Sequence, residues 1–167
     1  MNETQIKCAL QNCSLHSLLM VTSKVLSRAG FGDVQILDRR ESRQKSRYGG
    51  HELLCQMDVG TVPAKVVVKV VRDSVRQRML DELAGTVIRR NADMGILIAT
   101  KHVSPLAHRN KDRYNPLKLQ IIDGDGLAEL LTRFQIGVRL HGEVDYAFFG
   151  GLEAQSFRIL SFLAENQ

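Results

Sequence analysis

Two strand-like runs separated by a short turn constrain the fold of this chain more than any other feature. Residues 51–59 (HELLCQMDV) and 64–71 (AKVVVKVV) are rich in alternating or β-branched residues. The four residues between them, GTVP, have the length of a hairpin connection. We therefore expect the two runs to pair as antiparallel strands.

Helix and strand patterns alternate along the rest of the chain. Apolar residues at helical spacing, or a cap signal before them, predict helices over 14–29, 74–92, 104–115 and 126–134. Short apolar runs predict three further strands, over 34–37, 94–100 and 117–123. Gly30 is placed to end the first helix and Ser104 to cap the third. This order predicts an α/β fold with a central mixed sheet and helices on both of its faces.

The length of the chain allows one domain. Its 167 residues, 44% of them hydrophobic, are enough for one core and too few for two. We place the domain at residues 1–137 and a C-terminal extension at 138–167. The extension includes an amphipathic helix over 152–165, whose Leu152, Phe157, Leu160 and Phe162 need a partner surface. That surface is either the domain itself or a second subunit in a homodimer.

Composition excludes several classes of protein. No apolar run reaches the roughly 18 residues of a membrane span, so we expect a soluble, cytoplasmic protein without membrane contact. The three cysteines lack the spacing of a zinc site and are odd in number, which favours reduced thiols with Cys55 in the core. The formal charge of +5 and the pI near 9.3 favour polyanionic partners.

Much of the basic charge is concentrated in one predicted loop, just before the first hairpin strand. Its basic residues are Arg39, Arg40, Arg43, Lys45 and Arg47, against the single acidic Glu41. A flexible basic loop of this kind can hold DNA phosphates and release their counterions. The alternative is a solvated loop without a partner, since basic loops are common on protein surfaces.

Six segments in a fixed order give the chain a resemblance to a known family. They are GFGDVQIL, YGGHELL, VVVKVVRD, LDELAGTV, MGILIATKHVSPLAHR and LQIIDGDGLAELL, and they extend from about Leu15 to Gly137. In this order they resemble the Mrr-type (type IV) restriction endonuclease domain, a branch of the PD-(D/E)xK nuclease superfamily. The resemblance implies a restriction-endonuclease-like fold, duplex DNA as partner and Mg²⁺ as cofactor of an active member. It also implies that Lys101 contacts the DNA backbone.

Members of this family typically carry an aspartate on the first hairpin strand and Gln- or Glu-x-Lys on the second. Glu52, after Gly-Gly-His, takes the aspartate position. Aligned on VVVKVVRD, Lys69 takes the Gln or Glu position and Val71 the lysine position. A four-residue turn over 60–63 would place Glu52 opposite Val71 and Leu54 opposite Lys69. Asp58 is then expected to pair with Lys65.

The resemblance implies that Glu52 and Lys69 are the catalytic residues and that Glu52 also binds the metal ion. Phosphodiester hydrolysis in this superfamily needs carboxylates for Mg²⁺ and a lysine beside the reacting phosphate. An ammonium at Lys69 in place of an oxygen ligand would repel the cation, and Val71 has no charge to offer.

Three interpretations of function follow. The first is a DNA-binding protein whose metal-dependent site is eroded or rearranged. The second is an active Mg²⁺-dependent endonuclease in which Lys69 reaches diagonally across to Glu52. The third is a non-catalytic assembly module that acts through the C-terminal helix.

Overall fold

A five-stranded mixed sheet forms the centre of the molecule. The computed structural model describes residues 3–37 and 50–165. The strands are β1 (Phe31–Ile36), β2 (Gly50–Val59), β3 (Val62–Val71), β4 (Met94–Ala99) and β5 (Leu119–Ile122), and they lie side by side in chain order. The pairs β1–β2 and β2–β3 are antiparallel, while β3–β4 and β4–β5 are parallel. The predicted mixed sheet is confirmed.

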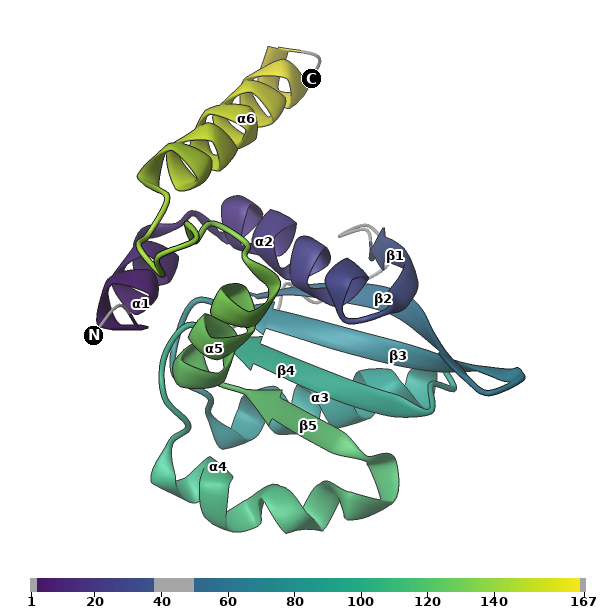
Figure 1. Cartoon of the computed structure of the whole chain (residues 1–167). Helices are drawn as coiled ribbons and strands as arrows, with labels where there is room; N and C mark the ends of the chain where they lie inside the picture. The colour runs from purple at the N-terminus through teal and green to yellow at the C-terminus, as the bar shows by residue number, and fades with distance from the viewer. Residues whose placement is uncertain (1–2, 38–49, 166–167) are drawn as a thin grey trace.

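Helices cover both faces of this sheet, as predicted. The helices are α1 (Glu3–Asn12), α2 (Leu15–Arg28), α3 (Gln77–Arg89), α4 (Pro105–Asn110), α5 (Gly124–Phe134) and α6 (Tyr146–Glu165). Figure 1 shows α2 and α5 on one face, with α3 and α4 on the other. No described helix is long and apolar enough to cross a membrane.

Two local sequence signals, Gly30 and Ser104, end or begin a helix at the expected residue. Gly30, with a φ of 94°, follows the end of α2, because glycine accepts this left-handed conformation without strain. Ser104 caps α4 by accepting a hydrogen bond from the Ala107 amide. The prediction of one helix over 104–115 was wrong: α4 ends at Asn110 and a 3₁₀-helix (Lys111–Leu117) follows. Pro116 lies inside that segment and disfavours α conformation in the residue before it.

The helices at the two ends of the chain differ from those that the sequence patterns predicted. Helix α1 was not predicted, although its Ile6 and Leu10 are buried. Helix α6 begins at Tyr146, earlier than the predicted start at Leu152. Phe149 and Leu152 of α6 are buried in the same core as α2 and α5. The first part of the C-terminal extension therefore packs on the domain.

The hairpin register differs from the prediction by two residues. The turn contains only Gly60 and Thr61, and Val59 pairs with Val62. A two-residue turn matches the twist of paired strands, and Gly60 has the positive φ of 68° that such a turn requires. Pro63, assigned to the turn, instead lies near the start of β3, where the lost amide donor matters little.

The shorter turn changes which residues face each other. Glu52 lies opposite Lys69 rather than Val71, and Asp58 lies opposite Pro63. Lys65 faces Gln56, and its ammonium donates to the backbone oxygen of Arg90 at 2.7 Å. The predicted Asp58–Lys65 pair was therefore wrong.

Strand β3 supplies side chains to two separate cores. Val66, Val68 and Val70 belong to the core under α1, α2 and α5, while Val67 and Val71 belong to the core under α3. Side chains alternate between faces along a strand, so Lys69 points to the α3 face, between Val67 and Val71. It is only 2% exposed.

Candidate active site between the hairpin and helix α3

A buried lysine and two glutamates form the most unusual polar cluster in the described structure. The Lys69 ammonium is hydrogen-bonded to a carboxylate oxygen of Glu82 and lies 3.9 Å from Oε1 of Glu52. Lys69 is 2% exposed, whereas Glu52 is 24% and Glu82 is 32% exposed. Both carboxylates are therefore more exposed than the ammonium with which they pair.

Strand and helix geometry bring these groups together. Glu52 and Lys69 are directly opposed on β2 and β3. Helix α3 packs over this part of the sheet through Leu83 and Val87, which are buried beside Val67 and Val71. Glu82 precedes Leu83, at the border between the apolar stripe of the helix and its solvent side.

Thr86 connects the helix to Glu52. Its hydroxyl lies 3.0 Å from Glu52 Oε1 and 3.2 Å from the backbone oxygen of Glu82, and it accepts a hydrogen bond from Arg89 Nη2 at 2.9 Å. Thr86 is 3% exposed. A single hydroxyl hydrogen serves one acceptor at a time, so Thr86 fixes Glu52 at the helix surface when it donates to Oε1.

Sequence reasoning brought Glu52 and Lys69 together but missed Glu82 and Thr86. Both missed residues are in α3, and Glu82 is 13 residues from Lys69 in the chain. The available signal was their i,i+4 spacing on a helix predicted to cover the hairpin, which places both side chains on one side of it. The pattern of apolar residues alone gave no reason to choose them over the other polar residues of the helix.

The observed register changes the comparison with the family motif. The aspartate and lysine positions of the family were expected to face each other, and the residue facing Glu52 is Lys69. If the position opposite Glu52 is taken as the lysine position, Lys69 fills it, whereas the alignment on VVVKVVRD placed Lys69 at the Gln or Glu position. Val67, two residues earlier on the same face, then takes the Gln or Glu position, and it is fully buried. Lys69 lies directly across from Glu52, not diagonally.

The donor atoms of the site suit a divalent cation poorly. In the described parts of the chain, no group of three His, Cys, Asp or Glu side chains is placed to hold a metal ion. Magnesium can be bound through two carboxylates with water and substrate phosphate completing the shell. Here both carboxylates face one ammonium, and Val67 offers no oxygen at the remaining position. A cation would have to displace Lys69 from both partners.

The residues predicted to contact DNA belong to two segments of the sequence, residues 39–47 and the segment that contains Lys101. Arg39, Arg40, Arg43, Lys45 and Arg47 lie outside the described residues. The described residues that flank them are beside the site: the Leu37 amide donates to the Glu52 backbone oxygen at 3.0 Å, and Gly50 faces Val71.

Lys101 follows β4 and is 45% exposed, with its ammonium 3.4 Å from Asp73. The pKa of Asp73 is lowered by the Ser74 amide and by Lys101. Lys101 is thus accessible but not free of a partner.

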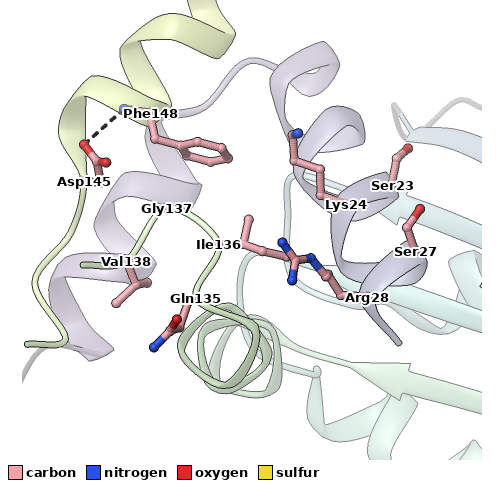
Figure 2. A pocket seen from close by; sticks show the side chains of 10 residues that line it. All are labelled: Ser23, Lys24, Ser27, Arg28, Gln135, Ile136, Gly137, Val138, Asp145 and Phe148. Atoms are coloured by element: carbon pink, nitrogen blue, oxygen red, sulfur yellow. Dashed lines mark hydrogen bonds between the residues drawn. The ribbon is translucent and has the colours of Figure 1, made fainter. Parts of the chain in front are cut away.

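An open hollow of about 540 Å³ lies elsewhere, between α2 and residues 135–148. Figure 2 shows Lys24 and Arg28 on one side of it and Phe148 and Asp145 on the other. Helix α2 covers the sheet face opposite to Lys69, so this hollow is separate from the carboxylate site.

Comparisons with known proteins agree with this fold. A family profile described as restriction endonuclease (Mrr_cat) matches residues 10–131. A solved structure, the DNA modification-dependent restriction endonuclease AspBHI, matches with a TM-score of 0.61 at 15% identity, over 92% of this chain and 40% of that one. The MspJI restriction endonuclease, solved in complex with a 27-mer oligonucleotide, matches with a TM-score of 0.49 at 18% identity, over 82% and 31%. A search of curated proteins found no match.

The mixed sheet with its antiparallel hairpin has the restriction-endonuclease-like fold. The profile match covers most of the sequence, so the chain belongs to the restriction endonuclease family. It spans well under half the length of the two solved relatives.

Proposed function

We propose that this chain is a duplex-DNA-binding protein of the restriction endonuclease family whose metal-dependent site is eroded. The observation that carries the proposal is the state of Lys69, which is buried and held by both Glu52 and Glu82. In a working site the carboxylates would hold the metal and the lysine would face the phosphate. Val67 removes a third polar group from the same face.

Charge supports the DNA-binding half of the proposal. The chain carries a formal charge of +5, and the basic stretch 39–47 lies in the sequence between Leu37, whose amide donates to the Glu52 backbone oxygen, and Gly50, which pairs with Val71. Phosphate contacts from arginine and lysine supply most of the affinity in sequence-independent DNA binding. We infer that residues 39–47 bind the DNA backbone beside the Glu52–Lys69–Glu82 cluster.

Incubation with duplex DNA and Mg²⁺ or Mn²⁺ tests the catalytic half. We expect no efficient cleavage by the unaltered chain, and Glu52→Ala should retain DNA binding. Glu82→Ala and Lys69→Ala are run in parallel. Efficient metal-dependent cleavage that all three substitutions abolish would show an intact site and overturn this half of the proposal.

A triple substitution tests the binding half. Replacing Arg39, Arg40 and Arg43 by alanine should weaken DNA binding and reduce the slope of log affinity against log salt by up to about 0.9 per lost phosphate contact. The matched control removes the same charge from the opposite face through Lys24, Arg28 and Arg133, in α2 and α5. An equal slope in the two triple variants would contradict a specific role for residues 39–47.

An active Mg²⁺-dependent endonuclease is the second candidate, and the exposure of Glu82 favours it. At 32% exposed, this carboxylate can rotate toward solvent and release Lys69 toward a bound phosphate. Glu52 and Glu82 would then be the two carboxylates available for Mg²⁺. The cleavage assay above separates this candidate from the first.

A homodimer formed through the C-terminal helix stays a prediction, as does an assembly role. Leu152 and Glu153 of α6 contact the domain, since Leu152 is buried and Glu153 accepts a hydrogen bond from the Ser14 amide. Deletion of residues 156–167 leaves both in place. If residues 156–167 pair with a second copy, this truncation lowers the mass measured by light scattering from that of a dimer to that of a monomer, with little change in melting temperature. An unchanged mass rejects the dimer.

A further inference from the structure

Arg89 is an exposed cation placed one hydroxyl away from Glu52. Its Nη2 donates to the Thr86 hydroxyl at 2.9 Å, and that hydroxyl lies 3.0 Å from Glu52 Oε1. Arg89 is in the last turn of α3 and exposed, whereas Thr86 is 3% exposed. A guanidinium carries five N–H donors in a plane, so most of them stay available to an anion in solution.

Gly85 provides the surface on which this guanidinium lies. A Cβ at Gly85 would be 3.0 Å from Arg89 Nη1 and 3.9 Å from its Cζ, with no other atom within 4 Å. Glycine inside a helix is about 1 kcal/mol less favourable than alanine. Its backbone is not left-handed, so the helix gains no conformational benefit from it. The consequence of the missing methyl group is room for Arg89 beside Thr86.

The charges of the cluster explain what Arg89 changes. The Lys69 ammonium meets two carboxylates, those of Glu52 and Glu82, and both of them are partly exposed. A phosphodiester approaching this cluster would be repelled. Arg89 adds a positive charge beside these carboxylates, and its exposed guanidinium offers donors that two oxygens of one phosphate can accept.

We propose that Arg89, seated on Gly85, binds a backbone phosphate of nucleic acid beside Glu52. The inference rests on the proposed DNA-binding function and adds a second contact, on helix α3, to the one inferred for residues 39–47. Thr86 is a positioning residue that holds the guanidinium and the carboxylate at fixed separation. The geometry assigns no base preference to this contact, because phosphates carry no sequence information.

Fluorescence anisotropy of a labelled duplex, between about 50 and 200 mM salt, tests the proposal. Arg89→Gln should weaken binding roughly tenfold, as expected for loss of a charged hydrogen bond, and reduce the salt slope by about 1. Arg89→Lys keeps the charge and should retain the slope while losing the two-pronged contact. Arg133→Gln, on α5 and exposed, is the matched control and should bind as the unaltered chain does.

Gly85→Ala separates a binding role from a structural one. Alanine should raise the melting temperature through helix propensity, yet weaken DNA binding because its methyl group, 3.0 Å from Arg89 Nη1, forces the guanidinium to shift by a few tenths of an ångström. In an Arg89→Gln background, the same change should have no further effect on binding. This double-mutant cycle shows whether Gly85 acts through Arg89.

Three outcomes overturn the inference, and they are distinguishable. If the unaltered chain binds DNA and the Arg89→Gln and Gly85→Ala variants keep its affinity and slope, Arg89 is not a phosphate contact and the proposed function stands. If the unaltered chain shows no salt-dependent binding at all, the proposed function fails and this inference fails with it. A fall in melting temperature for both Arg89 variants without a change in slope would show that Arg89 only supports Thr86.

Discussion

The two faces of strand β3 differ in one residue, the buried and charged Lys69. On the side of α1, α2 and α5 the strand presents Val66, Val68 and Val70, all fully buried. On the side of α3 it presents Val67, Lys69 and Val71, equally buried. The same strand thus builds an apolar core on one face and a charged cluster on the other.

The difference shows how the fold accommodates a buried charge. A lysine in an apolar core without a partner would be strongly unfavourable, because desolvation of the ammonium outweighs any packing gain. On the α3 face two carboxylates meet Lys69, and Thr86 supports one of them. On the opposite face, none of the described buried residues is acidic. The fold tolerates the charge only where the helix brings carboxylates to it.

Moving the charge to the apolar face should have the largest effect. In Val68→Lys an ammonium enters a core without a buried carboxylate, and we expect a loss of at least about 4 kcal/mol, enough to unfold a marginally stable domain. Circular dichroism with urea titration measures this. Val68→Met, the apolar control of similar length, should lose only about 1–2 kcal/mol. Similar stabilities for the two variants would mean that the faces are equivalent.

Removing both carboxylates should have the next largest effect. The double variant Glu52→Ala with Glu82→Ala leaves the Lys69 ammonium buried without its two partners, at a loss of about 2–4 kcal/mol. Adding Lys69→Met should recover most of that loss, because the apolar side chain fits between Val67 and Val71. Failure of the third substitution to restore the urea midpoint would contradict the importance of the ion pairs.

On the α2 face the hydrogen-bonded carboxylate of Glu153 should make the stability of the protein depend on pH in acid. Burial alone would raise the pKa of Glu153, but hydrogen bonds from Ser17 and Ser14 hold it below its ordinary value of 4.5. A lowered pKa in the folded state stabilises the protein above about pH 4.5, and this contribution is lost as the pH falls through the folded pKa.

Glu153→Gln tests the contribution of this carboxylate to stability. The variant should lose about 1–2 kcal/mol at neutral pH and show a shallower fall in melting temperature on acidification. Parallel curves for the variant and the unaltered chain would exclude this role.

The smallest effect is expected on the α3 face, where ionisation of Tyr114 should lower the stability of the protein in alkali. Burial, with the hydrogen bond to Asp81, raises the pKa of Tyr114 from 10 to about 12. The neutral phenol is therefore favoured in the folded state, so its contribution is complete below pH 10 and is lost as the pH rises to about 12.

Tyr114→Phe removes this titration. We expect a loss of about 1 kcal/mol at neutral pH and a reduced dependence of stability on pH above 10. Melting curves across the alkaline range provide the measurement. An unchanged alkaline dependence would mean that another group is responsible.

Periodicity and turn residues were sufficient to predict much of the fold. The hairpin, the strand predicted over 94–100 and observed as β4, and helices α2, α3 and α5 follow from apolar spacing in the sequence. Helix α1 was missed because its pattern is short, with only Ile6 and Leu10 buried. The family resemblance, based on ordered local segments, agrees with the profile match over residues 10–131.

The candidate site was predictable only in part. The sequence placed Glu52 and Lys69 on neighbouring strands, yet assigned them a register shifted by two residues. An error of two residues leaves every side chain on its correct face, so hydrophobic alternation gives no warning of it. Only the conformation of Gly60 and Thr61 distinguishes a two-residue turn from a four-residue one.

By itself, the sequence determined the order of the sheet strands and of helices α2, α3 and α5, because these elements depend on local spacing along the chain. The tertiary structure decided that Lys69 faces Glu52 and that Glu82, Thr86 and Arg89 join them. Those contacts depend on the hairpin register and on the rotation of α3 about its axis. The register follows from the two-residue turn at Gly60 and Thr61, and the rotation of α3 follows from packing of Leu83 and Val87 against the valines of β3, which no local pattern specifies.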